Sequence, residues 1–129
     1  MQYIIMLTIV LGLAASDFVT GIIKGYVNNS LSSTKMRKGG VNKIAEILVM
    51  ATACGLEIGI KLLGQYYSAE ILAKITGAIT AIAVFMYIVL MEIISILENY
   101  AEINREAAWV RNLLKRLKNV PNENKEEEK

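Results

Sequence analysis

Long apolar stretches alternate with short polar ones along this chain. The strongest apolar stretch covers residues 71–97 and carries no charge between Lys74 and Glu92. As an α-helix, its uncharged part (75–91) is about 25 Å long, and one more turn at each end reaches the roughly 30 Å of a bilayer's hydrocarbon core. A soluble protein would have to bury such a helix, and 129 residues offer little protein for that. The pattern therefore predicts a transmembrane span over about 71–97.

A second apolar stretch covers residues 3–23 and is interrupted only by Asp17. No Lys or Arg precedes it, so it is interpreted as a retained first span and not as a secretory signal. An aspartate at bilayer depth costs at least about 2.5 kcal/mol unless it faces protein or water. Thr20, Gly21 and Lys24 share its helix face. This face is either a packing and hydrogen-bonding site or the lining of an assembled pore.

The third apolar stretch, residues 44–64, is interrupted by Glu46, Glu57 and Lys61. At 100° per residue these three side chains form one stripe, with Glu57 and Lys61 in the favourable i,i+4 order for an ion pair. A charged stripe on a spanning helix must face protein or water. The stretch is therefore predicted to span the membrane with this stripe turned away from lipid.

The segment between the first two spans is polar and basic. Ser32 or Ser33 is predicted to cap a short helix, and Gly39-Gly40 to mark a turn after it. The short helix either lies on an anionic membrane surface or is an ordinary solvated loop. Its basic residues are Lys35, Arg37 and Lys38.

An amphipathic helix is predicted over about residues 100–119. Trp109 belongs to its apolar arc, and the opposite arc carries Arg111, Lys115, Arg116 and Lys118. The pattern is typical of a helix in the headgroup plane, and a partner-binding or self-associating helix is the alternative. Pro121 should end it, and residues 122–129 form a charged tail predicted to be disordered.

Composition and charge distribution extend this picture. Hydrophobic residues make up 54% of the chain and charged residues 20%, which suits a single all-α integral membrane domain over residues 1–121 with three transmembrane helices and a C-terminal amphipathic helix. Lys and Arg are concentrated in residues 24–43 and after Tyr100, and the 65–73 connection has neither. The positive-inside rule then predicts the N-terminus outside and the C-terminal helix in the cytoplasm.

The residues offer little for catalysis or cofactor binding. The chain has no His and a single cysteine, Cys54, in an apolar run. No nucleophile–base pair, metal-ligand cluster or phosphate-binding glycine loop is present. The basic tail is explained by the membrane and needs no nucleic acid. We therefore expect no enzymatic activity, no cofactor, no metal and no nucleic-acid partner.

The middle of the predicted bundle carries no charge. Residues near 10–12, 50–53 and 81–85 are all uncharged, whereas a channel or proton-coupled transporter usually places a polar site near the midplane. One copy therefore has no predicted permeation path, which disfavours a small ion-selective channel subunit.

Several short motifs follow one another along the chain. They are Asp17-Phe18-Val19-Thr20-Gly21, then Leu31-Ser32-Ser33 with Lys35, Gly39-Gly40 and Lys43, and finally Glu92 followed by Ser95-Ile96-Leu97-Glu98-Asn99. Their order, spacing and setting among three spans together resemble the phage holin family that also includes toxin-secretion holins. The likeness covers about residues 17–117. Relatives often break the helix after the Glu-Asn pair with Gly and Pro, whereas this chain has residues 104–108 without either.

The resemblance implies a protein encoded by a phage or prophage and inserted in the host cytoplasmic membrane. Such proteins assemble as homo-oligomers and open non-specific lesions that release an endolysin, or in some relatives a toxin, without needing direct contact with it. Gly77 and Ala81 share a face with Glu92 and offer a close-packing seam within or between copies. The alternative function is a non-lytic membrane scaffold or regulator acting through its cytoplasmic helix.

Overall fold

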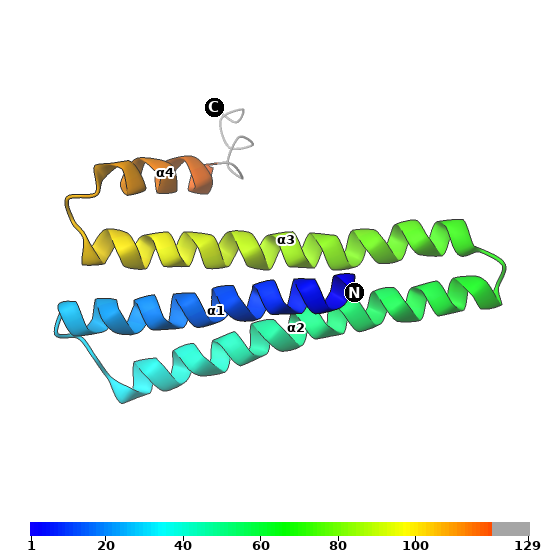
Figure 1. Ribbon diagram of the computed structural model, residues 1–129, viewed down its shortest axis with the longest axis horizontal. Helices are drawn as coiled ribbons and strands as arrows, with labels where there is room; N and C mark the ends of the chain where they lie inside the picture. The colour runs from blue at the N-terminus through cyan, green and yellow to red at the C-terminus, as the bar shows by residue number, and fades with distance from the viewer. Residues whose placement is uncertain (120–129) are drawn as a thin grey trace, which may run out of the picture.

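The computed structural model describes residues 1–119, and within them the chain is helical with no strand. Three long helices lie side by side, and a short fourth helix folds back along the third (Figure 1). The helices are α1 (Gln2–Val27), α2 (Ser33–Tyr66), α3 (Glu70–Ile103) and α4 (Ala108–Asn119). The predicted all-α architecture with three membrane-capable helices and a C-terminal helix is confirmed.

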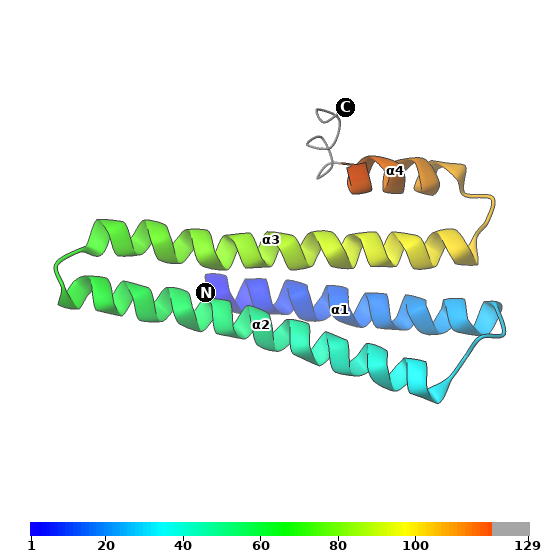
Figure 2. The same ribbon diagram turned by 180° about the vertical axis from the view of Figure 1, so that it is seen from behind.

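The three long helices exceed the thickness of a bilayer's hydrocarbon core. α1 has 26 residues, and α2 and α3 have 34 each, or about 39 and 51 Å at 1.5 Å per residue. The view from behind shows that α1 begins well short of the α2–α3 turn, so that the α2–α3 hairpin extends past the N-terminus (Figure 2). A span of roughly 30 Å therefore leaves helical ends protruding on both sides.

An apolar core joins the helices at mid-length. Val10, Met50, Cys54 and Ile88 are buried there. Outside it, large apolar side chains such as Leu11, Leu48, Ile79 and Met86 are exposed. Since so much exposed apolar surface is costly in water, this distribution favours a lipid environment.

The connection between α1 and α2 is shorter than predicted. It consists of residues 28–32, and Asn29 adopts a left-handed conformation (φ 50°). The predicted short helix is the beginning of α2, and the turn expected at Gly39-Gly40 is wrong, because both glycines are helical. A Cβ at either glycine would lie 3.8 or 3.9 Å from the ring of Phe18. These glycines therefore serve the contact between α2 and α1.

The C-terminal part also differs from the prediction. The helix expected over 100–119 is divided, because α3 continues to Ile103 and α4 begins at Ala108. Val110 and Leu114 of α4 pack against Ile94, Leu97 and Ala101 of α3. α4 thus runs antiparallel beside α3, with part of its apolar arc on protein (Figure 1). Pro121 and the tail 122–129 lie outside the described residues.

Candidate functional site

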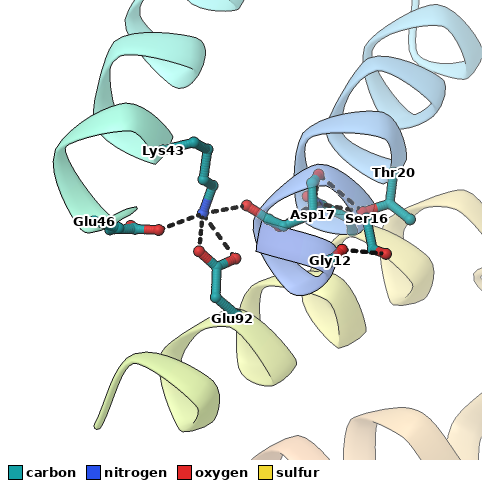
Figure 3. Close-up of polar contacts among 8 residues, drawn as sticks. Gly12, Ser16, Asp17, Thr20, Lys43, Glu46 and Glu92 are labelled. Carbon is teal, nitrogen blue, oxygen red and sulfur yellow. Dashed lines mark hydrogen bonds and ion pairs between the residues drawn. The ribbon is translucent and has the colours of Figure 1, made fainter. Parts of the chain in front are cut away.

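A single lysine joins the three long helices at the end where α1 meets α2. The Lys43 ammonium of α2 lies 2.7 Å from Oδ2 of Asp17 on α1 and 2.8 Å from both carboxylate oxygens of Glu92 on α3. Glu46, one turn along α2, is 3.3 Å away. Figure 3 shows the three carboxylates around the lysine. Carboxylates that are far apart in the sequence therefore meet at the Lys43 ammonium.

A buried amide extends this group toward the end of α3. The side-chain nitrogen of Asn99 donates to Oδ1 of Asp17 (2.9 Å), to the hydroxyl of Thr20 (3.1 Å) and to the Asp17 carbonyl (3.3 Å). A Cβ at Gly21 would lie 3.6 Å from the same nitrogen. The Asp-x-x-Thr-Gly motif therefore forms the surface that receives Asn99. We call the whole group the Lys43 cluster; its members are Asp17, Thr20, Lys43, Glu46, Glu92 and Asn99.

The Lys43 cluster holds more negative than positive charge. One ammonium faces three carboxylates, a formal excess of two negative charges. Glu92 is 1% exposed and Asp17 7%, while the Glu46 side chain retains 35% exposure. Removing a carboxylate from water costs several kcal/mol, and only close pairing and hydrogen bonding offset that cost. The cluster is therefore stable only while Lys43 and Asn99 stay in place.

A second charged group lies toward the opposite end of the bundle. Glu57 is 2% exposed, forms an ion pair with Lys61 and accepts a hydrogen bond from the side chain of Gln2 (3.3 Å). The Lys61 ammonium also donates to the hydroxyl of Tyr3 (3.1 Å). A Cβ at Gly77 would lie 3.1–3.4 Å from Glu57, so this glycine makes room for α2 on α3. We call Gln2, Tyr3, Glu57 and Lys61 the Lys61 cluster.

An uncharged layer separates the two clusters. On α3 it extends from Gly77, beside Glu57, to Glu92, beside Lys43, or about 22 Å along the helix. Ala81 is fully buried within it. In the part of the chain that the structure describes, the buried residues of this layer are apolar, which agrees with the absence of charge expected at mid-depth.

The sequence pointed to most members of these clusters but not to their partners. Lys43 and Asn99 belong to the sequence motifs, and Lys43 falls at the same predicted depth as Asp17, Glu46 and Glu92 when the three spans cross the membrane. The helical period contains no signal for the contacts of Gln2 and Tyr3. The structure also places Gly77 and Ala81 inside one copy: Gly77 lies against Glu57 of α2, and Ala81 is fully buried.

The residues predicted at the membrane surface are all exposed: Lys35, Arg37, Lys38, Trp109, Arg111, Lys115, Arg116 and Lys118. Lys118 forms an ion pair with Glu98 of α3. The ring of Trp109 lies 6.4 Å from that of Tyr100, measured between centroids. Within residues 1–119 no group of three or more acidic, Cys or His side chains is arranged to hold a metal ion.

A comparison with protein families assigns the chain to a known family. The model of the bacteriophage holin family matches residues 2–119. The chain belongs to the bacteriophage holin family. Comparisons with curated proteins and with solved structures found no match. Holins are non-enzymatic membrane proteins, which confirms the prediction that the chain is not an enzyme. With three membrane-capable helices, this holin-like chain is a multi-pass membrane protein in contact with the bilayer.

Proposed function

We propose that this chain is a phage or prophage holin that causes lysis of a bacterial host. It accumulates in the host cytoplasmic membrane with its N-terminus outside and its C-terminus in the cytoplasm, as the distribution of Lys and Arg predicts. Copies assemble and open non-specific lesions, through which an endolysin leaves without needing to bind the chain. The observation that carries this proposal is the family match over residues 2–119, read together with the two separated charged clusters.

The uncharged layer supports a lesion made from several copies. A path through one copy would need polar groups near mid-depth, and the described bundle has Val10, Met50, Cys54 and Ile88 there. These side chains pack the three helices together and leave the ionisable groups at either end. We therefore assign the opening to the assembly.

Small residues on the outer face of α2 support self-association. Ala51, Gly55 and Gly59 recur every four residues, and no atom of a neighbouring element lies within 4 Å of a Cβ built on either glycine. Small residues at this spacing allow transmembrane helices to approach closely and gain van der Waals contact. This face of α2 therefore suits contact with a second copy.

The charged clusters supply a driving force for opening. While the bundle is closed, Asp17 and Glu92 of the Lys43 cluster are buried away from water. A rearrangement that turns Asp17, Glu46 and Glu92 toward a water-filled space would restore their hydration and reduce their mutual repulsion. The opened assembly would then be lined by residues that are covered in the single copy.

Controlled expression tests the proposal. The chain is induced in bacteria with and without a cytoplasmic muralytic enzyme, while culture density, membrane potential and release of that enzyme are followed. Abrupt, delayed lysis that requires both proteins is the expected result. Normal growth with an intact membrane potential, at a verified membrane level of the chain, would refute the lytic role and favour the scaffold function.

A further inference from the structure

A cavity with a mixed polar and apolar lining opens beside the Lys43 cluster, at the end where α1 turns into α2. It has a volume of about 430 Å³ and is bounded by α1, the 28–32 connection, the first turns of α2 and the end of α3. In Figure 1 the first turns of α2 diverge from α1 on this side. The volume lies within the range of small-molecule sites in proteins. The lining is mixed, because Phe18, Ile22 and Met36 are apolar whereas Ser30 and Ser32 bring hydroxyl groups.

Three lysines reach this cavity, and they are not equivalent. Lys43 is held by its carboxylates, and Lys24 lies 3.6 Å from Glu102. Lys35 also lines the cavity, is exposed, and has no ion-pair partner among residues 1–119. The cavity therefore presents an uncommitted positive charge beside groups that are already paired.

The first turn of α2 adds partial positive charge beside Lys35, on the side of the cavity away from the paired groups of Asp17 and Lys43 along α2. Ser32 precedes the helix without making a side-chain capping bond, and the first turn contains no acidic residue. The backbone N–H groups that begin a helix lack partners within it and carry the positive end of the helix dipole. These N–H groups lie beside Lys35 and the two serines. Together they form a site suited to a singly charged anion that carries further polar groups.

The position of the cavity along the bundle indicates where that anion comes from. Lys43 and Asp17 lie at its floor, next to the uncharged layer. Lys24 lies seven residues further along α1, or about 10 Å toward the protruding end. The headgroup region on each side of a hydrocarbon core is roughly 5–7 Å thick. The cavity therefore lies at the depth of lipid headgroups.

We propose that this cavity binds the headgroup of an anionic phospholipid such as phosphatidylglycerol. The phosphate lies between the Lys35 ammonium and the first turn of α2, the headgroup hydroxyls face Ser30 and Ser32, and the glycerol backbone lies along Phe18 and Met36. A bound lipid contacts α1, α2 and α3 together and so stabilises their closed arrangement. The site depends on the membrane location of the chain and not on its lytic activity.

Lipid binding can be measured on the purified full-length chain. In a zwitterionic detergent, phosphatidylglycerol is added and compared with phosphatidylcholine of the same acyl chains. The thermal midpoint is followed by circular dichroism, and retained lipid is counted by native mass spectrometry. We expect phosphatidylglycerol alone to raise the midpoint and to remain bound. Equal effects of the two lipids would overturn the proposal.

Two variants locate the site. Lys35→Gln should weaken phosphatidylglycerol binding about fivefold or more, since a lysine near an anionic headgroup contributes about 1 kcal/mol. Lys38→Gln is the matched control, because Lys38 is also exposed on the first turns of α2 but does not line the cavity. Gly39→Leu should place its side chain in the cavity, because Gly39 lines the cavity and a Cβ there would lie 3.8 Å from the ring of Phe18. It should abolish lipid-dependent stabilisation.

The same assays identify the results that contradict a lipid site. Equal weakening by Lys35→Gln and Lys38→Gln would show diffuse attraction to surface charge in place of a site. Stabilisation by soluble glycerol phosphate equal to that by phosphatidylglycerol would assign the cavity to a free phosphate compound. Either result would overturn the proposal, whereas the lysis experiment would be unaffected.

Discussion

At the scale of single residues, Lys43 has the largest predicted influence on the closed bundle. It is the one cation in contact with Asp17, Glu46 and Glu92 in the described part of the chain. Its three N–H groups can reach Asp17 on α1, Glu92 on α3 and Glu46 on its own helix α2. Removal of a carboxylate leaves the lysine with other partners, whereas removal of the lysine leaves buried negative charges facing one another. The two kinds of substitution should therefore have opposite effects.

Replacing Lys43 should destabilise the closed bundle. For Lys43→Met we expect a loss of about 3–5 kcal/mol in the free energy of unfolding, as for other buried ion pairs from which one partner is removed. Denaturant unfolding in detergent measures this loss, and Lys38→Met serves as an exposed control. In cells, lysis should come earlier at equal membrane protein level. Unchanged stability of Lys43→Met would show that the ion pairs do not hold the helices together.

Replacing Asp17 should act in the other direction. Asp17→Asn retains a side chain of the same shape and removes one of the two excess negative charges, while Glu92 continues to pair with Lys43. If hydration of the cluster drives opening, the closed state is favoured and lysis is delayed. Lysis time and membrane protein level are measured together, so that lost insertion is not mistaken for lost function. Wild-type timing at equal protein level would leave Asp17 as a packing residue only.

At the scale of helices, glycines serve two different surfaces. Gly77 of α3 faces inward, where its lack of a side chain lets Glu57 approach. Gly55 and Gly59 of α2 have open space around them. A bundle with small residues both in its interior and on its outer surface can pack closely within one copy and still meet another copy.

Substitution of these glycines should separate folding from assembly. Gly55→Leu should reduce oligomer formation by a large factor with little effect on the packing of the single copy, because a Cβ at Gly55 has no atom of another helix within 4 Å. Gly77→Leu should instead disrupt the bundle, since even a Cβ there lies 3.1 Å from Glu57. Chemical crosslinking in membranes reports assembly, and thermal unfolding in detergent reports the fold. Undiminished crosslinking of Gly55→Leu would exclude this face of α2 as the contact.

The helices show how far a sequence pattern determines this structure. The 3.6-residue period places Glu57 and Lys61 on one protected face, and their ion pair was predicted. The period does not say which helix covers that face, so the contacts of Glu57 with Gln2 and Gly77 could not be derived. Two adjacent glycines usually indicate a turn, whereas Gly39 and Gly40 are helical and lie against Phe18 of α1. Such contacts between distant residues lie beyond local patterns.

At the scale of the whole molecule, the charges are sorted by depth. The Lys43 and Lys61 clusters lie about 22 Å apart along α3, and the apolar core fills the space between them. This separation fits a membrane protein whose two polar levels lie near opposite faces of the bilayer. The exposed basic residues of early α2 and of α4 lie at the Lys43 end. The orientation of the molecule in the membrane is therefore defined by the side, cytoplasmic or external, on which this basic end lies.

Cysteine labelling in intact cells tests the orientation. Cys54 is buried and is first replaced by alanine, so that each new cysteine is the only one in the chain. Ser68 is exposed in the α2–α3 turn, Ser33 begins α2, and Asn119 ends α4. With the basic end in the cytoplasm, a membrane-impermeant maleimide should label Ser68→Cys in sealed cells and should label Ser33→Cys and Asn119→Cys only after permeabilisation. Labelling is carried out before the onset of lysis, and a cytoplasmic marker protein verifies that the cells are sealed. Labelling of Asn119→Cys together with protection of Ser68→Cys would reverse the orientation, while labelling of both in sealed cells would contradict three spans.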